Sequence, residues 1–325
     1  MANSTLRIIY RSNSHAPFWL VAAKSGVWEK NGLTVDTSAQ LIREKAVEAL
    51  KSRRVDLISG NHHNLYVRNA KNSEDFVHLA QAGNNWTENR LVAANGIGSV
   101  EDLRGQKVVA DKLNSHAGLN IWLFLRQAGL DADRGDVELV ELRGAAEERW
   151  KRVLAGEFAG TFVGIPHDGR AAKAGANVIS VRAMPMIRGV TLTTTTSFVK
   201  NHEEEIRRLI RGFVDAIHFF INRRAETVEI LKEHATPILR LQSDDEVNQL
   251  YDEWTQSLER KPYPSLEAIS NVFQLAVRRN PEIAGFNPLA LWDTHYLREL
   301  DDSGYIDRLY KINEAGPGAP PRYYT

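Results

Sequence analysis

Short apolar segments alternate with longer amphipathic segments along the chain up to about residue 200. Residues 6–10 and 107–110 are short apolar runs, the pattern of buried strands. Residues 43–53 and 115–128 instead carry apolar side chains at helical spacing. Strands that alternate with helices of this length predict parallel sheets with right-handed crossovers. The remainder is predicted to be almost wholly helical, over residues 203–221, 225–234, 244–258 and 266–280.

Length, composition and charge place the chain among ordinary globular proteins. Its 325 residues correspond to two domains, and it is 43% hydrophobic and 25% charged. Because 41 basic side chains balance 41 acidic ones, neither nucleic acid nor an acidic membrane surface is expected as a partner. No apolar run approaches the length of a membrane span. The absence of cysteine excludes disulfides, thiolate metal sites and a cysteine nucleophile.

The N-terminal segment imitates a signal peptide only weakly. Its apolar run, residues 17–23, is of minimal length and opens with proline. The same stretch is typical of a strand at residues 6–10 followed by a helix that starts near Ser14. Cleavage near Ala23 would remove that strand, so we expect a cytoplasmic protein. A periplasmic location is the alternative if a leader has been removed.

Polar loops follow the predicted strands, at the edge where parallel sheets bind ligands. Five of the ten histidines fall in these loops: His15, His62, His63, His116 and His167. Polar loops favour histidine in any case, but such a set also predicts a cleft with acid–base groups that titrate near neutral pH. The same loops supply further candidates for ligand binding: Asn13, Ser14, Asn61, Asn85, Trp86 and Ser115.

Several of these candidates have two interpretations. Ser115 is expected to cap its helix, and the start of that helix is an anion seat. His62 and His63 are either surface loop residues or cleft residues, and since neighbouring side chains usually point apart, we expect one of them in the cleft. Trp86 is predicted to stack on an aromatic ligand. Arg188 either pairs with an anionic ligand or forms a salt bridge at a hinge.

The signatures of several common enzyme classes are missing. No GxGxxG follows a strand, and the sequence contains no Walker A pattern and no GxSxG elbow. Dinucleotide oxidoreductases, nucleotide triphosphatases and α/β-hydrolases therefore lose most of their support. The histidine spacing is not helical and no HExxH is present, so we expect no metal and no cofactor.

Three segments of the sequence resemble the SsuA/THI5-like (NMT1-like) family. They are GVWEKNGLTV at residues 26–35, EALKSRRVD at residues 48–56 and IGSVEDLRGQKVV at residues 97–109. The resemblance covers roughly residues 6–235. It implies an α/β, two-lobed type II periplasmic-binding-protein fold with mixed, mainly parallel sheets and a helical C-terminal region.

The resemblance also implies how the lobes are divided. Crossings near residues 86–92 and 187–194 would assign residues 1–88 and 192–325 to a discontinuous first lobe and residues 89–191 to the second, with the ligand cleft between them. Closure of the lobes would then bring together the candidate side chains of both: His15 and His63 against Ser115, His116 and His167.

The family contains two classes of function. Most members are solute-binding components of ABC importers for nitrate, alkanesulfonates, taurine, pyrimidines or aromatic acids, and others are cytosolic enzymes. The desulfinases among the enzymes carry a cysteine after the first strand, where this chain has residues 12–15, SNSH. The fungal pyrimidine synthase has a reactive histidine near the position of His62 and His63, but its cysteine-rich iron-binding segment is absent here. Neither mechanism carries over unchanged.

We therefore expect a cytosolic lyase, decarboxylase- or desulfinase-like, that acts on a small aromatic or heteroaromatic carboxylate or sulfinate. His63 or His15 would protonate the carbon as the acidic group leaves, with His62 as a third candidate. The helix start at Ser115 and a nearby arginine would bind the anion, and Trp86 would stack on the ring. The alternative is a solute-binding component of an ABC importer, with an ABC permease as its partner.

Overall fold

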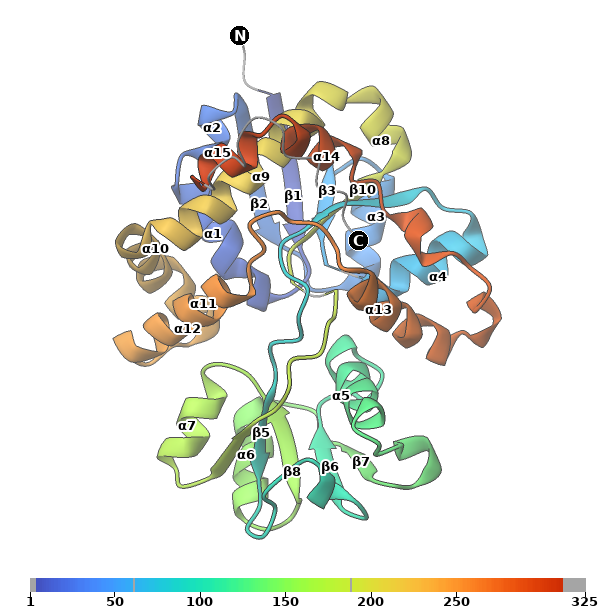
Figure 1. The fold of residues 1–325 in the computed structure, drawn as a ribbon, viewed down its shortest axis with the longest axis vertical. Helices are drawn as coiled ribbons and strands as arrows, with labels where there is room; N and C mark the ends of the chain where they lie inside the picture. The colour runs from blue at the N-terminus through green and yellow to red at the C-terminus, as the bar shows by residue number, and fades with distance from the viewer. Residues whose placement is uncertain (1–3, 61, 188, 312–325) are drawn as a thin grey trace, which may run out of the picture.

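The computed structural model describes residues 4–60, 62–187 and 189–311, and it contains two five-stranded sheets. The first sheet has the order β2-β1-β3-β10-β4 and the second has the order β7-β6-β8-β5-β9. In Figure 1 the two sheets form separate bodies joined by two extended segments. We call the body with the first sheet the first lobe and the other the second lobe.

The strands of the two sheets are short and mostly buried. The first sheet is formed by β1 (Ser4–Tyr10), β2 (Leu33–Ala39), β3 (Leu57–Ser59), β4 (Phe76–Gln81) and β10 (Thr191–Thr195). The second sheet is formed by β5 (Arg90–Ala93), β6 (Lys107–Ala110), β7 (Glu138–Glu141), β8 (Gly160–Val163) and β9 (Asn177–Ser180).

Each sheet contains one strand that runs against the others. β1 is parallel to β2 and β3, whereas β10 is antiparallel to both β3 and β4. In the second sheet β6 is parallel to β7 and β8, whereas β5 is antiparallel to β8 and β9. β5 and β10 are each the first strand after the chain passes between the lobes. The sheets are therefore mixed and mainly parallel, as predicted.

Helices cover both sheets and make up most of the C-terminal region. The first lobe begins with α1 (Ala16–Lys24), α2 (Val27–Lys30), α3 (Arg43–Lys51) and α4 (His62–Asn72), and the second lobe holds α5 (His116–Gln127), α6 (Ala146–Leu154) and α7 (His167–Lys173). The C-terminal helices are α8 (Thr196–Asn201), α9 (Glu203–Asn222), α10 (Arg224–Ile230), α11 (Thr236–Leu239), α12 (Asp244–Ser257), α13 (Leu266–Arg279), α14 (His295–Asp302) and α15 (Tyr305–Leu309). Within the described ranges, no helix is both long enough and apolar enough to cross a bilayer.

The two largest apolar clusters of the described residues differ in how they are divided between the lobes. One cluster lies within the first lobe, where Trp19 and Trp28 are buried and stacked with ring centroids 6.4 Å apart. A second cluster extends through both lobes, because it joins residues of α4, α5 and α13. The lobes are therefore in apolar contact on the α5–α13 side. The residue boundaries predicted for the lobes stay a prediction, and Thr191, assigned there to the second lobe, begins β10 of the first sheet.

Candidate functional site

A cavity of about 210 Å³ lies between the lobes, and side chains of both form its wall. The first lobe contributes polar residues that follow β1 and β3: Arg11, Ser14, His15, His62, His63 and Asn64. The second lobe contributes His116 and Asn120, and the segment between β4 and β5 contributes Glu88. Four of the five histidines predicted at the binding edge therefore meet at one cavity, which we call the histidine cavity.

Two of these histidines meet across the lobes. The Nδ1 atoms of His63 on α4 and His116 on α5 lie 3.3 Å apart, and the two rings are stacked with an interplanar angle of 9°. At this distance one ring nitrogen donates and the other accepts, so the pair can hold a proton between the lobes. His62 lies close by, with its ring centroid 5.4 Å from that of His116.

Both members of the His62–His63 pair are buried in this cavity, whereas we expected only one of them there. The expectation was based on a loop, in which neighbouring side chains point apart. The structure instead starts α4 at His62. Successive side chains of a helix are only about 100° apart, so both rings can border the same space.

The turn after β1 positions His15 with the help of a glycine. His15 is 6% exposed, and its Nδ1 lies 3.5 Å from the Ser59 hydroxyl. Gly60 has a φ of +99°, and a Cβ atom there would lie 2.9 Å from Cε1 of His15 and 3.0 Å from Cβ of Arg11. A side chain at residue 60 would therefore be strained and would displace both residues.

Asn120 is a cavity residue that sequence reasoning missed. It is fully buried on α5, and neither its Oδ1 nor its Nδ2 atom has a hydrogen-bond partner among the described residues. It stands alone as a polar side chain between apolar neighbours in residues 119–125, LNIWLFL. An amide inside such a run is the signal that could have found it, because an unpaired buried amide is costly.

Two charged residues of the histidine cavity were also missed. Arg11, which was not among the predicted site residues, lines the wall, and its Nη1 donates a hydrogen bond to the carbonyl oxygen of Gln40. Glu88 also lines the wall and accepts a hydrogen bond of 3.3 Å from the Trp86 ring nitrogen. The cavity therefore combines a guanidinium and a carboxylate with its histidines.

A second, more apolar cavity of about 100 Å³ borders the first. Ser14 and Gly189 line both cavities. Its apolar wall is formed by Ile165, Val190, Leu239, Leu250, Trp254 and Leu258, and its polar residues include Asn85 and Glu253. A ligand with a polar head and an apolar body would fit across the two cavities.

Comparisons with known proteins agree with this architecture. The family model described as NMT1/THI5 like matches residues 12–227. The chain belongs to the NMT1/THI5-like family. No curated protein matches the sequence significantly.

Solved structures show the same fold. The periplasmic aliphatic sulphonate binding protein SsuA from Escherichia coli is 18% identical, with 89% of this chain and 96% of that one covered and a TM-score of 0.64. A putative periplasmic sulfonate-binding protein SsuA from Methylobacillus flagellatus KT is 14% identical, with 99% of each chain covered and a TM-score of 0.69. The desulfurization enzyme DSZB is 14% identical, with 93% of this chain and 100% of that one covered and a TM-score of 0.62. The chain therefore has the type II periplasmic-binding-protein fold.

Trp86 of this NMT1/THI5-like chain is not on the cavity wall, where it was predicted to stack on an aromatic ligand. It is fully buried, and its ring packs against Phe124 and Phe162 with centroids 5.3 Å and 5.6 Å away. A ring enclosed by two phenylalanines offers no face to a ligand. Trp254, on the wall of the apolar cavity, is the aromatic side chain that the structure places beside the site.

The remaining predicted residues are placed as follows. Ser115 caps α5, because its Oγ accepts from the Gly118 backbone nitrogen at 3.2 Å and donates to the Lys112 carbonyl oxygen at 2.7 Å. His167 begins α7 and, like Asn13, lines neither cavity. Burial lowers the pKa of His167. Asn61 and Arg188, which were also predicted site residues, lie outside the described residues. No group of three or more potential metal ligands occurs in the part of the chain that the structure describes.

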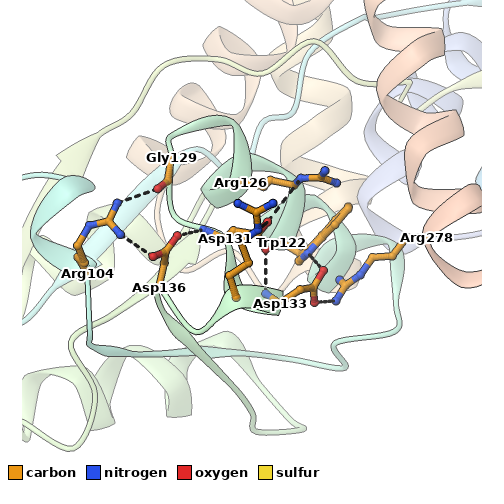
Figure 2. A network of polar contacts seen from close by, with 9 residues as sticks. Arg104, Trp122, Arg126, Gly129, Asp131, Asp133, Asp136 and Arg278 are labelled. Atoms are coloured by element: carbon orange, nitrogen blue, oxygen red, sulfur yellow. Dashed lines mark hydrogen bonds and ion pairs between the residues drawn. The ribbon is translucent and has the colours of Figure 1, made fainter.

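Contacts on either side of the site hold the lobes together. On one side Arg170 of α7 forms two hydrogen bonds of 2.8 Å with the carboxylate of Glu246 on α12. On the other side Arg278 of α13 reaches the second lobe, where its guanidinium lies 4.0 Å from the Trp122 ring centroid and pairs with Asp133 (Figure 2). The lobes therefore touch each other on both sides of the cavities.

Proposed function

We propose that this NMT1/THI5-like chain binds a small organic anion between its lobes and acts on it as a lyase of the decarboxylase or desulfinase type. The observation that carries the proposal is the His63–His116 pair, whose Nδ1 atoms lie 3.3 Å apart although they belong to different lobes. Such a pair is assembled only when the lobes close, and it places a transferable proton at the wall of the cavity.

An anionic head group suits the charge and the donors of the histidine cavity. Arg11 contributes a permanent positive charge, and the surrounding imidazoles donate hydrogen bonds when protonated. The adjacent apolar cavity, with Trp254 and Leu250 on its wall, suits an aromatic or heteroaromatic body. These two features together favour an aromatic or heteroaromatic acid.

In the proposed reaction, the bond between the ring carbon and the acidic group breaks while His63 protonates that carbon. For a carboxylate, CO2 leaves, its former bonding pair stays on the carbon, and the proton of the His63 imidazolium forms the new C–H bond. For a sulfinate, SO2 leaves in the same way. His15 and His62 are further candidates for the donor, because they lie on the same wall. We place this enzyme in the cytoplasm, without a partner protein.

The second candidate is the solute-binding component of an ABC importer. It is supported by the contacts that hold the lobes closed, and by the likeness to the two SsuA proteins, which are described as sulfonate-binding. In this candidate the histidines and Arg11 only hold the ligand, the chain is periplasmic, and an ABC permease is its partner.

A turnover assay distinguishes the two candidates. The purified chain is incubated with a panel of aromatic carboxylates and sulfinates, and release of CO2 or sulfite is measured. We expect product with the wild type and a loss of about 10²–10⁴-fold in His63→Ala. His295→Ala removes an exposed histidine at the start of α14 and is the matched control. Ligand that is bound but recovered unchanged would overturn the lyase and favour the importer component, and binding of no acid in the panel would overturn both.

A further inference from the structure

Asn120 is the least satisfied polar side chain on the wall of the histidine cavity. It has no exposed surface, and both polar atoms of its amide are without a partner among the residues that the structure describes. Leaving a buried donor or acceptor unpaired is costly, because the group has lost its hydrogen bonds to water. The neighbouring positions on α5, Leu119 and Ile121, show that apolar side chains are accommodated on this part of the helix.

An amide makes a different demand on a ligand than a positively charged group does. Arg11 offers only donors, so any oxygen of an anion satisfies it. Asn120 offers one donor side and one acceptor side, so it is fully satisfied only by a group that returns both. The oxygens of a sulfonate, sulfinate or carboxylate are all acceptors, and they would leave Oδ1 of Asn120 unpaired.

Glu88 adds to this demand. Glu88, in the segment that joins β4 to β5, lines the same cavity. The wall of the cavity therefore carries acceptors, Oδ1 of Asn120 and the oxygens of Glu88, as well as the donors of Arg11. A plain anion would face acceptors that it cannot pair, whereas an anion with an N–H or O–H group beside its acidic group would pair with both sides.

We propose that Asn120 selects ligands that carry an N–H or O–H donor next to a carboxylate, the pattern of pyrrole-2-carboxylate, over acids that lack the donor. This inference rests on the proposed anion site and names the class of ligand that the site takes. It narrows the proposed reaction to carboxylates. The ring nitrogen would donate to Oδ1 of Asn120, while Nδ2 donates to the carboxylate.

Calorimetric titration of the full chain with three probes tests the inference. Pyrrole-2-carboxylate and furan-2-carboxylate have nearly the same shape but differ in the N–H donor, and benzenesulfonate has acceptors only. We expect the wild type to bind the pyrrole acid about tenfold or more tighter than the furan acid, because the unpaired Oδ1 is costly. Benzenesulfonate should bind no better than the furan acid.

Two variants and a control assign the preference to this residue. Asn120→Leu keeps the shape without polar atoms and should reduce the preference to about twofold or less. Asn114→Leu, at an exposed asparagine just before the same helix, should keep it. Asn120→Asp retains the acceptor and loses the donor, so it should weaken both carboxylates while the preference remains. If Asn120→Leu does not fold, Asn120→Asp still tests the inference.

The outcomes separate this inference from the proposed function. Equal binding of both carboxylates by the wild type would overturn the role of Asn120 and leave the anion site standing. A preference that persists in Asn120→Leu would also overturn it, because another residue would then be responsible. Binding of none of the probes at millimolar concentration would overturn the anion site itself, and the inference with it.

Discussion

The lobes meet on two sides of the site, and the two contacts differ in kind. On the α7–α12 side the contact is polar: Arg170 and Glu246 form a two-pronged ion pair in which Glu246 is 6% exposed. On the α5–α13 side, Leu275 and Val272 of α13 belong to one apolar cluster with residues of α5. In Figure 1, α7 lies below α12 on one side of the molecule and α5 lies below α13 on the other.

The difference indicates how the site opens. Apolar packing is non-directional and tolerates small rotations, whereas a two-pronged ion pair depends strongly on geometry. We therefore expect the lobes to pivot about the α5–α13 contact while the Arg170–Glu246 contact breaks. Opening of this kind would separate His63 from His116 and give a ligand access to Asn120.

Leu275→Ala should produce the largest effect, because it removes a fully buried side chain from the cluster shared by both lobes. We expect a loss of about 2–5 kcal/mol in the free energy of unfolding, measured by chemical denaturation. Leu266→Ala, on the same helix but 71% exposed, is the control and should change it little. Equal effects of the two substitutions would contradict a pivot built on apolar packing.

Glu246→Gln should open the lobes without unfolding either of them. The amide cannot neutralise Arg170, so the closed state should lose about 2 kcal/mol relative to the open state. Small-angle scattering should show a larger radius of gyration. Asp245→Asn changes an exposed neighbour in the same way and should leave the radius unchanged. An unchanged radius in Glu246→Gln would show that this ion pair does not hold the lobes closed.

Low pH should weaken the Arg170–Glu246 contact and open the lobes, as the Glu246→Gln substitution does. Hydrogen bonds from Arg170 lower the pKa of Glu246 below its ordinary value of 4.5. A carboxyl group whose pKa is lowered in the closed form stabilises that form at pH values above the ordinary pKa of the group. This stabilisation is lost as the pH falls through the lowered pKa. Scattering should show that the wild type opens on acidification below pH 4.5, whereas Glu246→Gln should lack this transition. A transition of equal size in both proteins would point to another group.

Arg278→Lys should have the smallest effect. Arg278 lies over the Trp122 ring and pairs with Asp133, whose side chain is 53% exposed. Figure 2 shows this pair at the end of a network of polar contacts. Exposed pairs contribute little, so we expect a change of less than about 1 kcal/mol in the free energy of unfolding. The control is Arg134→Lys, at a side chain 84% exposed. A loss comparable to that of Leu275→Ala would mean that this side is not held by apolar packing.

Local patterns in the sequence predicted most of the fold. The alternation of strands and helices was confirmed, as was the cap at Ser115. Each of these depends on residues close together in the chain. The family resemblance supplied the two-lobed arrangement, which periodicity alone does not contain.

The candidate site was predicted less completely, because it depends on contacts between distant parts of the chain. The positions of His15, His62, His63 and His116 after strands predicted a binding edge, and the family resemblance implied that the histidines of the two lobes meet, as they do at one cavity. The enclosure of Trp86 by Phe124 and Phe162 depends on packing around a crossing, which local sequence does not show. Asn120 looked like one residue of a helix, and its position on the cavity wall is set by how α5 faces the first lobe.

A crystal structure of the full chain with pyrrole-2-carboxylate tests the central claim most directly, since it shows where the ligand lies. We predict that the acid lies in the histidine cavity, with its carboxylate near Arg11 and the His63–His116 pair and its ring toward Trp254. A ligand bound outside this cavity, with the His63–His116 contact undisturbed, would contradict the claim that the space between the lobes is the functional site.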